Sequence, residues 1–160
     1  MVEFQLSPKK ETLKISILFF ILFTASNSFL TIRTFIYEQA DLNALGPANI
    51  AVTYISFIIS TLYAPTCPLR IKYQILIATV AYTLNFSTGL FVPMVSTDFK
   101  YALTCLWGAI AGLSAGLLWV SQGRYVHLVC ELSKTSNPNL KEQCFGLFSL
   151  IYCMSHIPAG

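Results

Sequence analysis

Charge is what this sequence lacks most. Only 11% of its 160 residues are Asp, Glu, Lys or Arg, and 55% are hydrophobic. Soluble domains carry ~25% charged residues, so this composition argues against an ordinary soluble globular protein. The net charge of +3 therefore has to be assigned segment by segment, and it does not indicate binding to nucleic acid.

The motifs of common enzymes are also missing. There is no glycine-rich phosphate loop and no nucleophile elbow, and all seven acids lie outside the long apolar stretches. His127, Cys130 and Cys144 fall in or beside one polar segment, but a metal site would need a fourth ligand and tighter spacing. The sequence predicts no enzyme, no cofactor and no metal.

What the sequence does contain is a series of apolar stretches. The clearest, Tyr101 to Gln122, is uncharged, and its 22 residues would span about 33 Å as a helix, enough for a hydrocarbon core of about 30 Å. We predict an all-α membrane protein whose helices cross the lipid bilayer about five times, after an amino-terminal segment at 1–14. The predicted spans are 15–36, 47–66, 73–95, 101–122 and 144–160.

The first span has an alternative interpretation. A basic start, an apolar run and then Ala25, Ser26 and Ser28 could form a cleaved signal peptide. The apolar character resumes at Phe29 and continues to Ile36, which makes the run long enough to cross a membrane. This length favours a retained transmembrane helix.

The distribution of Lys and Arg predicts the orientation. If the amino terminus is cytoplasmic, eight of the ten Lys and Arg residues fall on the inner side, and only Arg33 and Lys100 on the outer side. Basic residues concentrate in cytoplasmic segments, so we predict a multi-pass protein with a cytoplasmic amino terminus. No cysteine falls in an outer loop, so the sequence does not predict a disulfide framework.

Small residues form a strip along the fourth predicted helix. Gly108, Gly112 and Gly116 recur every fourth residue, so they share one helical face. Helices in lipid associate through close backbone approach, which such small residues permit. We expect a helix-packing groove at this strip.

Polar residues within the spans are candidates for a cavity or a gate. Asn27 lies near the middle of the first span, where an unpaired amide costs several kcal/mol, so a partner is expected. That partner is either an interhelical acceptor, which we favour, or a substrate. Arg33 lies nearer the outer surface, where it could reach Glu38 or lipid headgroups, or belong to a transport site.

Trp119 and Gln122 are candidates for the same cavity or gate. They place an indole N–H and an amide near the cytoplasmic end of the fourth helix. The plainer alternative is an interfacial tryptophan and a solvated amide, as in the aromatic belts of many membrane proteins.

Three stretches resemble a known family. They are FFILFTASNSFLTI, YISFIISTLYAP and GAIAGLSAGLLWVSQGRYV, which begin at Phe19, Tyr54 and Gly108. They resemble the amino-terminal part of the Unc-ninety-three-like, or ion channel regulatory, proteins, a branch of the major facilitator superfamily. The family motif is a Gly/Ala-rich helix ending in Leu-Trp, then a Gln-Gly pair and Tyr. Here these residues are Leu118, Trp119, Gln122, Gly123 and Tyr125.

This resemblance implies an incomplete amino-terminal facilitator half over residues 15–160. It also implies action by association with another membrane protein, such as a channel or a receptor. The loop CPLRIKYQ lacks the Gly-x-x-x-Asp-Arg-x-Gly pattern of typical facilitators, although it keeps Arg70 and Lys72. Two alternatives stay open: part of a solute transporter whose missing carboxyl-terminal half completes the site, and a truncated product without independent activity.

Overall fold

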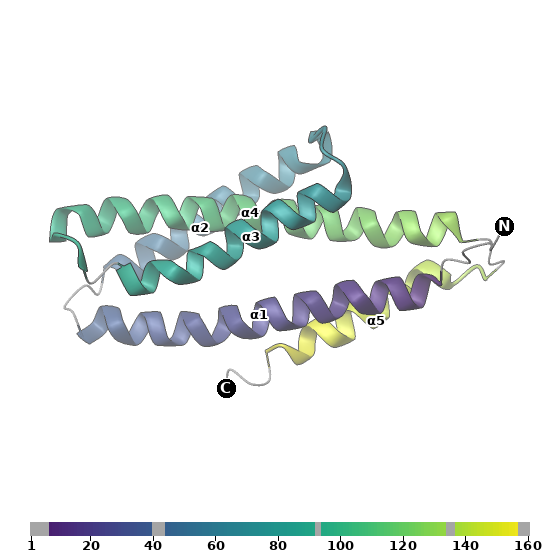
Figure 1. Cartoon of the computed structure of the whole chain (residues 1–160), viewed down its shortest axis with the longest axis horizontal. Helices are drawn as coiled ribbons and strands as arrows, with labels where there is room; N and C mark the ends of the chain where they lie inside the picture. Colours follow the sequence, from purple (N-terminus) through teal and green to yellow (C-terminus); the bar gives the residue numbers. More distant parts are fainter. Residues whose placement is uncertain (1–6, 40–43, 92–93, 134–136, 157–160) are drawn as a thin grey trace. The chain divides into compact units, whose positions relative to one another are not determined.

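The computed structural model describes residues 7–39, 44–91, 94–133 and 137–156, and within these ranges the chain is helical, with no strand. The helices are α1 (Pro8–Gln39), α2 (Leu45–Tyr63), α3 (Ile71–Phe91), α4 (Thr97–Leu132) and α5 (Leu140–Met154), with a 3-10 turn η1 (Ala64–Thr66) after α2 (Figure 1). Three segments, Pro8–Glu38, Leu45–Thr66 and Phe99–Leu132, are long and apolar enough to cross a membrane. The predicted all-α, membrane-like fold class is confirmed.

Helix α1 begins seven residues earlier than the predicted span. Pro8 is its first residue, where the missing N–H of proline costs nothing, and the N–H of Glu11 donates to the carbonyl of Ser7 at 3.1 Å. Glu11 lies in the first turn, where a carboxylate interacts favourably with the helix dipole. The polar residues before Ile15 therefore extend the helix beyond its apolar part.

Helix α4 continues ten residues past the predicted end at Gln122. The residues after Gln122 include charged side chains, which is why the sequence indicated a polar segment there. Three buried residues nevertheless lie on one face of the helix, because they follow the i, i+3, i+4 pattern: Val126, Val129 and Cys130. One apolar face and the absence of proline let the helix run on to Leu132.

Prolines and asparagines explain the remaining boundaries. Cys67 adopts an extended backbone before Pro68, as a residue before proline usually does, and the chain leaves η1 there. Helix α5 starts four residues earlier than predicted, after a turn in which the side chain of Asn137 accepts from the N–H of Asn139 at 3.0 Å. It ends at Met154, and residues 157–160 of the predicted fifth span lie outside the described residues.

The predicted number of five spans stays a prediction. Among the described residues, the three membrane-length segments belong to α1, α2 with η1, and α4. Helix α5 has 15 residues and is about 22 Å long, which is shorter than a hydrocarbon core of about 30 Å. The observed boundaries of α2 and α3 lie within four residues of the predicted ones.

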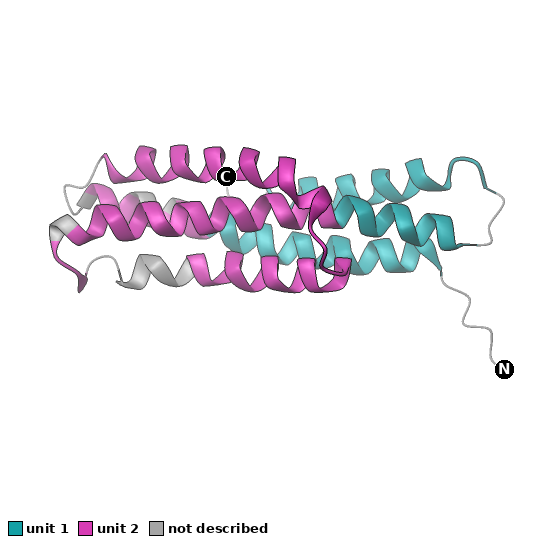
Figure 2. Cartoon of the chain, turned by 90° about the horizontal axis from the view of Figure 1, so that it is seen from above, with its two compact units in different colours: residues 1–28, 122–160 teal, residues 29–121 magenta. Residues whose placement is uncertain are grey.

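The chain divides into two compact units, coloured separately in Figure 2. Unit 1 comprises Met1–Ser28 and Gln122–Gly160, and unit 2 comprises Phe29–Ser121. Helices α1 and α4 each contribute residues to both units. That residues 15–160 form one membrane domain stays a prediction.

Aromatic rings form the core of unit 1. The ring of Phe19 on α1 meets Phe148 on α5 edge to face, with centroids 5.1 Å apart. Phe23 and Tyr152 repeat this arrangement one helical turn away, at 5.2 Å. Edge-to-face pairs add about 0.5–1.5 kcal/mol each beyond the burial of their area. Two such pairs in register hold α1 against α5.

Candidate functional site

The glycine strip of α4 lies against α2 within unit 2. A Cβ atom added to Gly108 would lie 2.6 Å from the Asn49 side-chain nitrogen, and one added to Gly116 would lie 2.6 Å from the Ser60 Cβ. A Cβ on Gly112 would overlap the backbone carbonyl oxygen of Thr53. Because this last neighbour is backbone, a side chain at Gly112 could be accommodated only if the helices moved apart.

Two hydrogen bonds cross the same interface. The Asn49 Nδ2 donates to the backbone carbonyl of Thr104 at 2.7 Å, and the Ser60 Oγ donates to the carbonyl of Leu113 at 2.6 Å. Such interhelical bonds in membranes contribute about 0.6 kcal/mol on average. The α2 residues that face the glycine strip of α4 are thus mainly polar: Asn49, Thr53, Ser56 and Ser60. Another protein could not use this groove while α2 occupies it.

Arg33 is buried in unit 2. Its side chain is 7% exposed, and the guanidinium carbon lies 5.9 Å from the centroid of the Phe29 ring. A cation over an aromatic face is stabilised by the negative charge density of the ring. The side chain is therefore packed within the protein, whereas the sequence indicated that it could extend to Glu38 or to headgroups.

Asn27, in unit 1, contacts the end of α5. Its Nδ2 lies 3.4 Å from the backbone carbonyl oxygen of Ser155 and 3.3 Å from the Nδ1 of His156. The partner expected for Asn27 therefore lies in the same chain, just after the end of α5.

Trp119 and Gln122 differ in their surroundings. Trp119 is half-buried and is not without an interaction partner. Gln122 is 4% exposed, and its Nε2 has no hydrogen-bond partner in the described part of the chain. Asn27 and Gln122 belong to unit 1, and Arg33 and Trp119 to unit 2. The four candidates are therefore divided between the two units, and a shared cavity or gate stays a prediction.

The remaining motif residues lie on or next to the buried face of α4. Leu118 is fully buried, and Gly123 has open space where a Cβ would be. The hydroxyl of Tyr125 donates to the carboxylate of Glu11 at 3.0 Å, and the Nζ of Lys14 lies 2.6 Å from the other oxygen of the same carboxylate. The motif tyrosine thus links the end of α4 to the start of α1 within unit 1.

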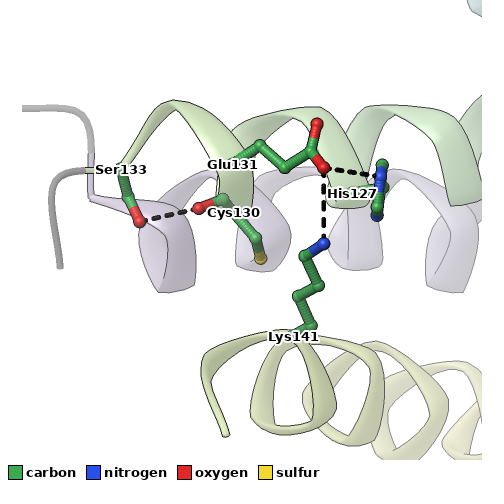
Figure 3. Close-up of polar contacts among 5 residues, drawn as sticks. All are labelled: His127, Cys130, Glu131, Ser133 and Lys141. Atoms are coloured by element: carbon green, nitrogen blue, oxygen red, sulfur yellow. Dashed lines mark hydrogen bonds and ion pairs between the residues drawn. The ribbon is translucent and has the colours of Figure 1, made fainter. Parts of the chain in front are cut away.

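A second polar cluster joins α4 to α5 (Figure 3). The Oε1 of Glu131 lies 3.0 Å from the Nε2 of His127 and 3.4 Å from the Nζ of Lys141, and the Ser133 hydroxyl donates to the carbonyl of Cys130. These ionic side chains are about half exposed. Among the described residues, no group of three metal-ligating side chains could hold an ion.

Gln74 is fully buried, although no sequence pattern singled it out as a candidate. Its Oε1 accepts from the Ser121 hydroxyl at 2.7 Å, and its Nε2 donates to the carbonyls of Cys67 and Leu69 at 3.2 and 2.6 Å. One side chain on α3 therefore fixes the loop after η1 and joins it to α4. A glutamine shortly after two prolines is a weak sequence signal, because its partners are mostly backbone carbonyls.

The described residues are helical and include three segments long and apolar enough to cross a membrane, which places the protein in the all-α, membrane-like class. Over 155 residues, 92% of the chain, its sequence is 27% identical to protein unc-93 homolog A from Bos taurus. The chain spans about a third, 32%, of the length of that relative. No family model matches the chain, and no solved structure matches it.

Proposed function

We propose that this chain is part of a multi-pass membrane protein that acts by association with another membrane protein, such as a channel or a receptor, and not by catalysis. The observation that carries the proposal is the similarity to protein unc-93 homolog A, which extends over 92% of the chain. The similar region includes all five helices or most of each. We further propose the amino-terminal part of a facilitator-like fold, with a cytoplasmic amino terminus.

The packing of unit 2 restricts where such a partner could bind. The glycine strip of α4 is covered by α2, so the partner must contact another surface. The opposite face of α2 presents large apolar side chains, including Ile55, Ile58 and Leu62, which are 58–70% exposed. In a membrane this face meets either lipid or another helix.

The test begins with the full-length protein purified from its native membrane in mild detergent. The partner that co-purifies in a fixed ratio is identified and then reconstituted in vesicles, alone and together with this protein. If the partner is a channel, we expect its conductance to change when the protein is present. Purification without a stoichiometric partner would contradict the proposal.

Two variants of equal exposure locate the surface. Ile58 on α2 and Leu76 on α3 are both 58% exposed, so Ile58→Trp and Leu76→Trp add similar bulk at similarly open positions. If the outer face of α2 binds the partner, Ile58→Trp should reduce co-purification and Leu76→Trp should not. Equal recovery with both variants would exclude this face of α2.

A second candidate function is part of a solute transporter, favoured by the burial of Arg33 within α1. Ionisable residues inside membrane spans often mark substrate or ion pathways. Reconstituted vesicles containing the full-length protein should then take up a solute, and Asn27→Leu should abolish the uptake. Absence of uptake would exclude this function. If neither a partner nor uptake is found, a product without independent activity is the remaining reading.

A further inference from the structure

Two buried cysteines meet between α4 and α5 within unit 1. Cys130 is 6% exposed and Cys144 is fully buried, and both are free thiols. Their side chains are hydrogen bonded to each other. Two sulfur atoms in contact, carried by different helices, are the geometry from which a disulfide can form.

A neighbouring ion pair supports this arrangement of the two helices. Cys130 lies two residues before Leu132, the last residue of α4, and Cys144 is the fifth residue of α5. Glu131 contacts Lys141 at 3.4 Å, and Lys141 lies about one helical turn before Cys144. Figure 3 shows the Cys130 sulfur on the side of α4 from which the Lys141 ammonium approaches. The ion pair and the thiol contact therefore both hold the end of α4 against the start of α5.

We propose that Cys130 and Cys144 are a reversible oxidation site, at which hydrogen peroxide converts the two thiols into a disulfide that links α4 to α5. In the predicted orientation this end of α4 is cytoplasmic, where thiols are kept reduced and disulfides are usually transient. Hydrogen peroxide is little larger than water, so it is an oxidant of the size that reaches a nearly buried thiol. Small thiols of the cytoplasm reverse the reaction by thiol–disulfide exchange.

The reaction has two steps. Cys130, the more exposed of the two, loses its proton, and its sulfur attacks one oxygen of the peroxide. The O–O bond breaks, hydroxide takes up the proton and leaves as water, and Cys130 becomes a sulfenic acid. The sulfur of Cys144 then attacks the Cys130 sulfur, the S–S bond forms, and the sulfenic hydroxyl leaves as water with the Cys144 proton. Two thiols and one peroxide molecule thus give one disulfide and two water molecules, and two electrons pass from sulfur to the peroxide oxygens.

Proximity, and not an activated thiol, selects this pair. Burial disfavours a thiolate, so the first step should be slower at Cys130 than at the exposed Cys153. The second step joins sulfurs that are already in contact, so it should be fast. Cys153 lies nine residues after Cys144, about 13.5 Å along α5, whereas the Cα atoms of a disulfide lie within about 7 Å. Cys153 is therefore the matched control.

The first experiment uses the unaltered full-length protein in lipid nanodiscs. It is treated with hydrogen peroxide, and the remaining thiols are then blocked with N-ethylmaleimide under denaturing conditions. Trypsin cleaves after Lys134 and Lys141, which both lie between the two cysteines, so a disulfide joins two separate peptides. Chymotrypsin also cleaves after Phe145, which separates Cys144 from Cys153. Mass spectrometry identifies the joined peptides.

We expect a species in which Cys130 and Cys144 are linked, two hydrogen atoms lighter than its two peptides together. It should increase with the peroxide concentration and disappear after reduction with dithiothreitol. Oxidation of Cys153 in the same sample shows that the peroxide was active. If Cys153 is oxidised while Cys130 and Cys144 are recovered as blocked thiols, or as sulfinic acids without a link, the proposal is overturned.

Two variants test the consequence for α4 and α5. Cys153→Ser keeps both thiols of the pair, so peroxide should raise the fraction of denaturing detergent at which the protein unfolds. In Cys130→Ser, Cys144 has no partner thiol, so peroxide should not raise this fraction. An equal increase in both variants would show that oxidation stabilises the protein elsewhere and would overturn the proposal.

Discussion

The side-chain amide of Asn49 on α2 donates a 2.7 Å hydrogen bond to the backbone carbonyl of Thr104 on α4. The hydroxyl of Thr104 itself has no hydrogen-bond partner among the described residues, although its side chain is buried. The bond between the two helices therefore depends on the side chain of Asn49 and on the main chain of Thr104.

This asymmetry gives a first prediction. Asn49→Ala should lower the free energy of unfolding in detergent by about 0.6–1.7 kcal/mol, because an interhelical hydrogen bond is lost. Thr104→Val keeps the carbonyl and replaces an unpaired hydroxyl with a methyl group of similar size, so it should be neutral or slightly stabilising. Circular dichroism during titration with a denaturing detergent measures both. A larger loss from Thr104→Val would contradict the observed contact.

The glycine strip gives a second prediction, with a control on the same helix. Gly112→Ala should destabilise the protein by about 1–3 kcal/mol, because the new Cβ overlaps the backbone of α2. Gly123→Ala meets open space and removes a glycine from a helix interior, so it should stabilise by up to about 1 kcal/mol. The same denaturation measurement tests both changes, and effects of equal sign would contradict the close contact of α2 with α4.

The third prediction concerns Gln74 and Ser121. Gln74→Leu leaves the Ser121 hydroxyl and two loop carbonyls without their partner, so the loss of stability should be about 1–3 kcal/mol. Gln143→Leu, at an exposed position on α5, is the control and should change stability by less than about 0.5 kcal/mol. In a double-mutant cycle, Gln74→Leu and Ser121→Ala should be coupled by more than about 0.5 kcal/mol. Strict additivity would show that the pair does not interact.

The fourth prediction compares two phenylalanines of α5. Phe148 is 4% exposed and packs on Phe19, whereas Phe145 is 38% exposed. Phe148→Ala should destabilise the contact of α1 with α5 by about 3–5 kcal/mol, as for other buried aromatic residues. The loss from Phe145→Ala should be less than half as large. Comparable losses would show that α5 does not pack through Phe148.

The helical class and the approximate positions of the helices could be predicted from the sequence, because long apolar stretches flanked by charged residues have few other solutions in a membrane. The residues at which α1 begins and α4 ends could not be predicted in this way. A membrane-span pattern stops at the first charge, whereas the helices continue as long as one face is buried, as at Val126 and Val129. Hydropathy reports the extent of the apolar core and not the extent of the helix.

For the candidate site residues, the sequence indicated which residues would need a partner but not which residue the partner would be. The four-residue spacing of Gly108, Gly112 and Gly116 placed them on one face, but the occupant of that face follows only from tertiary structure. Asn27 could be expected to have a partner, yet nothing in the sequence connects it with His156, which is 129 residues away. Gln74 gave only a weak signal because its partners are mainly backbone groups.

The most direct test of the proposed function is native mass spectrometry of the complex that contains this chain, extracted from its own membrane. Partner association predicts an assembly whose mass equals the protein plus a different membrane protein in a fixed ratio. A mass that corresponds to the protein alone, or to copies of itself, under conditions that preserve other membrane complexes would contradict it.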